Sequence, residues 1–198
     1  MLKEKEIIEK IESKREKWNP QRQGIRIRIL FIGESPPRQA PQRFFYQETA
    51  ILYRATRKAF IQKFKEIPED KFLHFFKKLG CYLYDLFKTP GKKVNKVRRT
   101  ELINAMKQLD DFVQKKREKN EIDAIIVVLM RVYNELKKQG LIDKWRNKGI
   151  KIFSLPFPIG GFYRIYVRGL KSILNNLIEQ NIIKRDEVNK IIEQIKKE

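Results

Sequence analysis

IRIRILFIGESPP, residues 25–37, joins a strand pattern to a proline-rich loop. Apolar residues first alternate with Arg and then run without a break from Ile29 to Ile32, which predicts a strand buried at its carboxyl end. Gly33 ends this strand and would let the backbone approach a ligand closely. Pro36 and Pro37 stiffen the loop that follows. The segment therefore predicts one strand of a parallel sheet with a ligand loop at its carboxyl end.

The rest of the chain repeats this alternation of strands and helices. Further strands are expected at residues 81–87, 123–129 and 150–155, of which the second is the clearest buried parallel strand. Helical spacing predicts helices at residues 2–18, 47–64, 68–79, 100–116, 131–139, 163–179 and 185–197. We therefore expect a single α/β domain over residues 1–198, with a four-stranded parallel sheet and right-handed crossovers. Its N-terminal helix falls within residues 1–20 and its C-terminal helix within residues 180–198.

The charge balance favours a polyanionic partner. The 198 residues include 45 Lys and Arg against 24 Asp and Glu, a formal net charge of +21. Lys and Arg release counterions when they bind phosphates, so DNA, single- or double-stranded, is the first candidate, and RNA stays open. The alternative is a heat-adapted composition with solvated basic faces. A membrane surface is a weaker alternative, because the terminal helices mix acidic residues with basic ones.

The composition also excludes several classes of site. One Cys and one His rule out an internal disulfide framework, a Cys-based zinc site, an iron–sulfur cluster and a multi-His metal site, so no metal or cofactor is expected. The GxxxxGK[ST], GxGxxG and GxSxG fingerprints are missing. No apolar run approaches the roughly 20 residues that span a bilayer, and no secretory signal is present. We expect a cytoplasmic monomer without membrane contact.

Three unusual loops are predicted to meet at one edge of the sheet. They follow Ile32, Asp85 and Leu155, each at the carboxyl end of a predicted strand, where ligands bind in open parallel sheets. In the first loop, Glu34 could orient a water molecule or stabilise a cationic sugar, or could instead accept backbone N–H groups or pair with Arg38 or Arg43. Ser35 could bind a base or phosphate, or shape the turn.

Aromatic and acidic residues near these loops could contact a base. Of Phe44, Phe45 and Tyr46, we expect one ring to stack on a base and two to pack in the core. Asp85 could read the edge of a base or cap a turn. His74 falls inside the helix predicted at residues 68–79, away from the three loops, and Cys81 has no CxxC or acid–base partner close in the sequence. We interpret both as structural.

The remaining candidates are basic or lie at a helix N-terminus. The segment PFPIGG, residues 156–161, precedes a predicted helix, whose free N–H groups could bind phosphate. The alternative is a solvated basic face. The expected backbone-binding residues are Arg38, Arg43, Lys92, Lys93, Gly160, Gly161, Arg164 and Arg168.

In their order and spacing, these segments resemble the uracil-DNA glycosylase superfamily. GESPP, residues 33–37, is similar to the GEAPG, GQDPYH and GINPG motifs that follow strand one in its members, and LPFPIG, residues 155–160, stands where their HPSP-like motif follows the last strand. The resemblance covers residues 25–177 and implies a three-layer α/β/α fold. It departs from the family at Phe157, where the second motif has His, and at Asp85, in the segment that often bears a base-reading Asn. The four Cys of the cluster-bearing branch are also missing.

The resemblance implies a DNA glycosylase, a hydrolase that flips a uracil or other damaged base from DNA and breaks its N-glycosidic bond during base-excision repair. Glu34 and Ser35 would be catalytic. The residues expected to hold the base are Gly33, Pro36, Pro37, Phe45, Tyr46, Asp85 and Phe157. Because the His and Asn equivalents are absent, a non-catalytic nucleic-acid-binding module on the same fold is the alternative. An RNA-binding or RNA-processing protein is a third possibility.

Overall fold

The computed structural model describes residues 4–38 and 43–198. The expected start of the first helix at residue 2, and the part of the first loop at residues 39–42, lie outside them. The helices are α1 Glu4–Lys17, α2 Ile51–Lys63, α3 Phe72–Lys78, α4 Arg99–Arg117, α5 Met130–Lys138, α6 Leu141–Asn147, α7 Phe162–Glu179 and α8 Arg185–Lys197. Short 3-10 helices occur at Pro20–Gln23, Phe45–Gln47 and Glu69–Lys71.

Four parallel strands form the sheet, as the sequence predicts. They are β1 Ile29–Gly33, β2 Cys81–Asp85, β3 Ala124–Val128 and β4 Lys151–Leu155, in the order β2-β1-β3-β4. The first strand is shorter than predicted. Residues 25–28 bond instead to loops: the Ile27 N–H donates to a Glu121 carboxylate oxygen at 3.0 Å and the Arg28 N–H to the Gly80 carbonyl at 2.8 Å.

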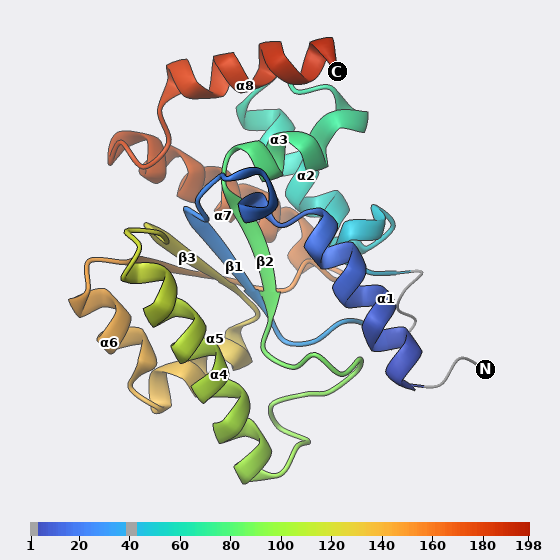
Figure 1. Cartoon of the computed structure of the whole chain (residues 1–198), viewed down its shortest axis with the longest axis vertical. Helices are drawn as coiled ribbons and strands as arrows, with labels where there is room; N and C mark the ends of the chain where they lie inside the picture. Colours follow the sequence, from blue (N-terminus) through green and yellow to red (C-terminus); the bar gives the residue numbers. More distant parts are fainter. Residues whose placement is uncertain (1–3, 39–42) are drawn as a thin grey trace.

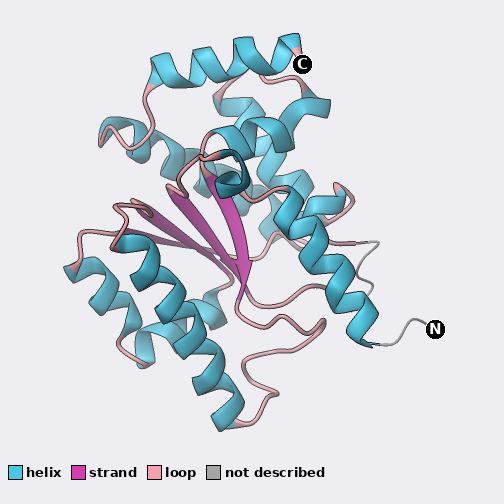
Figure 2. Cartoon of the chain, in the orientation of Figure 1, coloured by secondary structure: helices cyan, strands magenta, loops and turns pink. Residues whose placement is uncertain are grey.

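Helices cover both faces of this sheet (Figures 1 and 2). Side chains alternate along β1, so that Ile29 and Phe31 pack on one face and Leu30 and Ile32 on the other. The first face packs against α2, α3, α7 and α8, and the second against α4, α5 and α6. The predicted three layers are therefore present.

One helix was missed in the sequence. The seven residues of α6 follow Gly140, whose φ of +75° separates them from α5. The helix is anchored by Ile142 and by the fully buried Trp145, whose indole N–H donates to Asp110 at 2.8 Å. So short a segment shows little periodicity, and its position depends on this tertiary contact.

No helix in residues 4–38 and 43–198 combines the length and the hydrophobicity that a bilayer crossing requires.

Candidate functional site

The three predicted loops do meet in one cavity at the carboxyl edge of the sheet. The cavity has a volume of about 1090 Å³. Its lining includes Gly33–Arg38 from the end of β1 onward, Asp85 at the end of β2 with Gly91–Lys93 after it, and Phe157 and Ile159 after β4. A fourth contribution, from Leu129 and Arg131 after β3, was not predicted as part of the site. The parallel topology explains the convergence, since all four strands end at the same edge.

Hydrogen bonds beyond the sheet hold the first two loops together. The N–H groups of Leu86 and Phe87 donate to the carbonyls of Gly33 and Glu34, at 3.0 and 2.9 Å. The Gly91 N–H donates to the Pro36 carbonyl at 2.8 Å. Gly91 has a φ of +75°, and a Cβ there would lie 2.4 Å from the Arg38 side chain, so only glycine fits. The β1 and β2 loops therefore form one continuous wall.

Glu34 lies at the centre of this wall and is paired with Arg131. The Arg131 guanidinium donates from Nε to Glu34 Oε1 at 2.8 Å and from Nη2 to Oε2, a bidentate pair. The Val94 N–H also donates to Oε1, at 2.9 Å. The pKa of Arg131 is raised, chiefly by the hydrogen bond to Glu34. Glu34 thus accepts a backbone N–H and pairs with Arg, as the structural alternative predicted, but its partner is Arg131 instead of Arg38 or Arg43.

Ser35 joins two loops instead of shaping its own turn. Its hydroxyl donates to the Lys92 carbonyl at 2.8 Å and so joins the β1 loop to the basic segment after β2. The hydroxyl hydrogen is used within the protein, and the catalytic role expected for Ser35 finds no support in this geometry. A backbone contact across 57 residues has no local signature in the sequence.

Asp85 is buried at the base of the cavity. Arg15 Nη2 donates to its Oδ2 at 2.8 Å, and both side chains are almost completely buried. Burial raises the pKa of Asp85 to about 6, although the charge and hydrogen bond of Arg15 oppose the rise. A Cβ on Gly33 would lie 2.3 Å from Asp85 Oδ1, so glycine is required where β1 passes this carboxylate. Asp85 is thus held by an ion pair that neither sequence hypothesis included.

The aromatic prediction needs correction. Phe44, Phe45 and Tyr46 are all buried. The ring centroid of Tyr46 lies 5.1 Å from that of Phe45 and 5.5 Å from that of Phe44. Phe44 and Phe45 line the cavity, but Tyr46 lies in the core, and its hydroxyl accepts the Leu83 N–H at 2.8 Å. Two of the three rings, instead of the one expected, thus line the cavity. Phe157, half-buried, is a further aromatic ring in the lining.

More cations line the cavity than the sequence indicated. Four predicted ones line it: Arg38, Arg43, Lys92 and Lys93. Arg54, Lys96 and Arg131 join them. Lys92 pairs with Glu101 and Arg131 with Glu34, whereas the other five form no ion pair within residues 4–38 and 43–198. Gly160, Gly161, Arg164 and Arg168 lie outside the lining, exposed at the start of α7, so the cavity does not include that part of the prediction.

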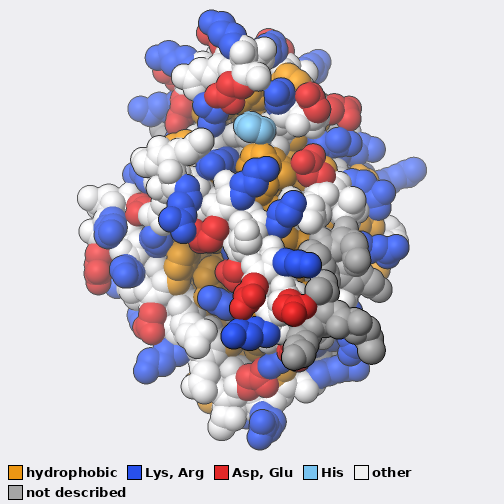
Figure 3. Space-filling model, turned by 45° about the vertical axis from the view of Figure 1, so that its right-hand side comes forward, with side chains coloured by type: hydrophobic (Ala, Val, Ile, Leu, Met, Phe, Trp, Pro, Cys, Tyr) orange, Lys and Arg blue, Asp and Glu red, His pale blue; other side chains and the backbone are white. Residues whose placement is uncertain are grey.

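The cations that line the cavity have to be distinguished from the basic side chains that are common elsewhere on the surface. In the space-filling view of Figure 3, Lys and Arg are spread over the whole face, with Asp and Glu between them. Net charge alone therefore does not locate a site. The cavity differs in combining two buried carboxylates with cations that have no ion-pair partner among the described residues.

Exposed apolar side chains stand beside the cavity. Ile159, which is part of its lining, is 61% exposed. Met130, next to the lining residue Arg131, is 43% exposed, and Phe162 and Ile165 at the start of α7 are also exposed. These are the exposed large apolar side chains nearest to the cavity along the chain.

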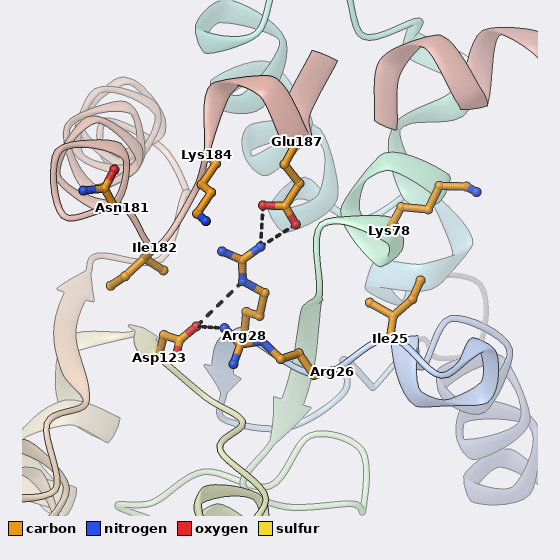
Figure 4. Close-up of a pocket in the computed structure, with 9 residues that line it drawn as sticks. All are labelled: Ile25, Arg26, Arg28, Lys78, Asp123, Asn181, Ile182, Lys184 and Glu187. Carbon is orange, nitrogen blue, oxygen red and sulfur yellow. Dashed lines mark hydrogen bonds and ion pairs between the residues drawn. The ribbon is translucent and has the colours of Figure 1, made fainter. Parts of the chain in front are cut away.

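A second cavity, of about 520 Å³, lies at the opposite edge of the sheet. Figure 4 shows Arg28 between the carboxylates of Glu187 and Asp123. Arg28 Nη1 donates to the two Glu187 oxygens at 2.5 and 2.6 Å, and Arg26 donates to Asp123 at 2.8 Å. These pairs connect α8 to the sheet, so we assign this cluster a structural role.

Replacing Glu187 with Gln should therefore lower the free energy of unfolding. Arg28 is mostly buried and would lose a charged partner, whereas Glu187 is partly solvated, so we expect a loss of about 1–2 kcal/mol. Denaturant unfolding measures it. Glu193→Gln, an exposed position on the same helix, is the control and should change stability by less than about 0.5 kcal/mol. Equal stabilities of the two variants would contradict the structural role.

His74 and Cys81 lie outside the cavity. The His74 ring meets Trp18 edge to face at 5.0 Å, and Cys81 is fully buried in β2, where burial raises the pKa of its thiol. Within residues 4–38 and 43–198 no group of three or more His, Cys, Asp or Glu could hold a metal ion.

Comparisons of the chain with protein-family models, with curated proteins and with solved structures give no match.

Proposed function

We propose that the protein is a DNA glycosylase with a uracil-DNA glycosylase-like fold. It would take one nucleotide of a DNA strand into the carboxyl-edge cavity and hydrolyse its N-glycosidic bond. Two observations support the fold assignment: helices cover both faces of a four-stranded parallel sheet, and the GESPP and PFPIG loops line the same cavity. These are the features that the resemblance implies.

The observation that carries the functional proposal is the position of Glu34. This buried carboxylate faces a cavity surrounded by five cations that have no ion-pair partner in the part of the chain that the structure describes. Such cations suit the phosphates on either side of a nucleotide. A carboxylate next to the sugar between those phosphates would stabilise the positive charge that develops as the glycosidic bond breaks, or orient the attacking water.

The pair with Arg131 bears on how Glu34 would act. The Arg131 side chain is 41% exposed and that of Glu34 only 8%. Arg131 can therefore turn towards solvent or a phosphate, while Glu34 stays held by the Val94 N–H. Binding of a strand would draw Arg131 to a phosphate and leave Glu34 free for the sugar or water.

The exposed apolar residues fit a flipped nucleotide. Proteins that open a duplex insert apolar side chains between base steps, which offsets the cost of removing a base from the stack. Ile159, beside the cavity, is suited to this role. Because Phe157 cannot donate a hydrogen bond, charge on the departing base would be stabilised by cations in the lining. Gly160, Gly161 and Arg164 lie outside it.

A specific observation favours a second candidate, a nucleic-acid-binding module without catalysis. Both oxygens of Glu34 are occupied by Arg131, and Oε1 also accepts the Val94 N–H. If Arg131 keeps its place when DNA binds, Glu34 is only the centre of an ion pair.

Base release from defined oligonucleotides separates the two candidates. Single- and double-stranded DNA with one uracil, hypoxanthine, xanthine or other damaged base is incubated with the protein and then treated with hot alkali. We expect strand cleavage at the site of at least one of these bases. Tight, salt-sensitive binding without cleavage of any substrate would favour the binding module.

A further inference from the structure

The N-terminal helix contributes a charged side chain to the interior. Of the described residues of α1, only Ile11 and Arg15 are buried, and Arg15 is 3% exposed. Its guanidinium donates from Nη1 to Glu12 and from Nη2 to Asp85 Oδ2, at 2.8 Å for the latter. It also lies 5.4 Å from the centroid of the Phe44 ring. Both Asp85 and Phe44 line the cavity.

Stability is a poor explanation for this ion pair. Burying two charges costs desolvation that their attraction barely offsets, and an apolar pair of similar volume would serve as well. Arg15 Nε has no hydrogen-bond partner among the described residues, which adds to the cost. A costly pair at the base of a cavity indicates a role in that cavity.

Arg15 fixes which oxygen of Asp85 is available. The one hydrogen bond described for the carboxylate is at Oδ2, from Arg15. Oδ1 lies against Gly33, at the start of the GESPP loop, where a Cβ would be only 2.3 Å away. The Arg15 contact and the Gly33 backbone thus hold the carboxylate from two sides.

We propose that Arg15 is a positioning residue, which holds Asp85 so that Oδ1 accepts a hydrogen bond from an amino group on the edge of the base in the cavity. This inference rests on the proposed function, and it adds the class of base. An ionised carboxylate only accepts hydrogen bonds, so it favours the edge that presents the additional amino donor. Damaged bases that keep an exocyclic amine would be preferred over those that lack one, such as uracil and hypoxanthine.

The charges around Asp85 make the preference depend on pH. Arg15 and Glu12 approach it from α1, Glu34 from the end of β1, and the hydroxyls of Tyr46 and Tyr84 from nearby. Arg15 favours the carboxylate, and the pKa of Asp85 is about 6. The preference should therefore be complete well above that pH, half lost near it and absent well below it, as Oδ1 or Oδ2 gains a proton. Without Arg15 the pKa rises, so the decline should begin at higher pH.

The experiment compares two oligonucleotides that are identical except for one central base, guanine or hypoxanthine, which differ by a single amino group. Dissociation constants are measured by fluorescence anisotropy from about pH 5 to pH 8. We expect the wild-type protein to bind the guanine strand about tenfold more tightly near neutral pH. Asp85→Asn should reduce the ratio to about one.

Variants of α1 isolate the part of Arg15. Arg15→Met should lose most of the preference at neutral pH and shift its midpoint upward, whereas Arg15→Lys, which keeps the charge, should retain the midpoint more closely. Lys10→Met, an exposed change on the same helix, should leave the ratio and its midpoint unchanged. Thermal unfolding confirms that each variant is folded, and if Arg15→Met is not, Arg15→Lys and Asp85→Asn carry the comparison.

The outcomes separate the two proposals. Equal binding of both strands by the wild-type protein would overturn this inference and leave the proposed function standing. A preference that depends on Asp85 but keeps its size and midpoint in both Arg15 variants would overturn the positioning role. Absence of strand binding under all conditions would overturn both.

Discussion

Replacement of Glu34 by Gln is expected to reduce base release by about 10²- to 10⁴-fold, the range typical of a lost general acid–base group or an electrostatic stabiliser. Gln keeps the shape of Glu34 and can still accept a hydrogen bond from the Val94 N–H, but it has no negative charge to stabilise the positive charge that develops on the sugar. Binding of the strand should change little, because the phosphates are held by cations. The measurement is single-turnover cleavage after alkali on the substrate that the wild-type protein processes.

Two further variants make this result specific. Glu118→Gln, exposed at the end of α4, removes the same charge far from the cavity and should behave as the wild-type protein does. Arg131→Gln removes the partner of Glu34 and should retain base release, with weaker strand binding, if Arg131 leaves Glu34 during the reaction. Base release by Glu34→Gln at the wild-type rate would eliminate the catalytic role. Loss of release in Arg131→Gln with binding intact would show that the ion pair itself is needed.

The double variant Lys93→Gln/Lys96→Gln is expected to weaken DNA binding and to flatten its dependence on salt. Both side chains are exposed beside the cavity and form no ion pair in residues 4–38 and 43–198. Each phosphate that the protein no longer neutralises should lower the slope of log K against log salt by about 1 unit, so the double variant should lower it by about 2. The affinity at low salt should fall on the order of tenfold or more.

Lys190→Gln/Lys197→Gln provides the matched control for this experiment. It removes the same charge from exposed positions on α8, which lies at the end of the molecule away from the cavity (Figure 1). Its salt slope should stay near that of the wild-type protein. Equal slopes for the two double variants would mean that the general positive charge of the protein binds the strand, and not the cations that line the cavity. Repeating the titration with RNA of the same sequence tests whether the cations that line the cavity distinguish deoxyribose from ribose.

Local patterns in the sequence were sufficient for the sheet. The uninterrupted apolar runs at residues 29–32 and 124–128 predict buried parallel strands, because both faces of such a strand lie under helices. The rule that ligand loops gather at the carboxyl edge then predicts the cavity, which does form where the loops after β1, β2 and β4 meet. The four strands and their parallel direction follow from local or general properties, so one sequence carries them, whereas the strand order and the short helix α6 were not predicted.

The partners within the cavity were decided by the tertiary structure. Glu34 pairs with Arg131 across 97 residues and Asp85 with Arg15 across 70. Such pairs depend on which side chains the packed helices bring within reach, and a sequence with many Arg residues offers many equivalent choices. Aromatic residues present the same problem: Phe44, Phe45 and Tyr46 are adjacent rings in the sequence, and only the packing of the sheet against α2 and α3 buries all three. The sequence by itself therefore determined where a site would form, while the packed fold determined which charges in that site are paired and which remain available to a ligand.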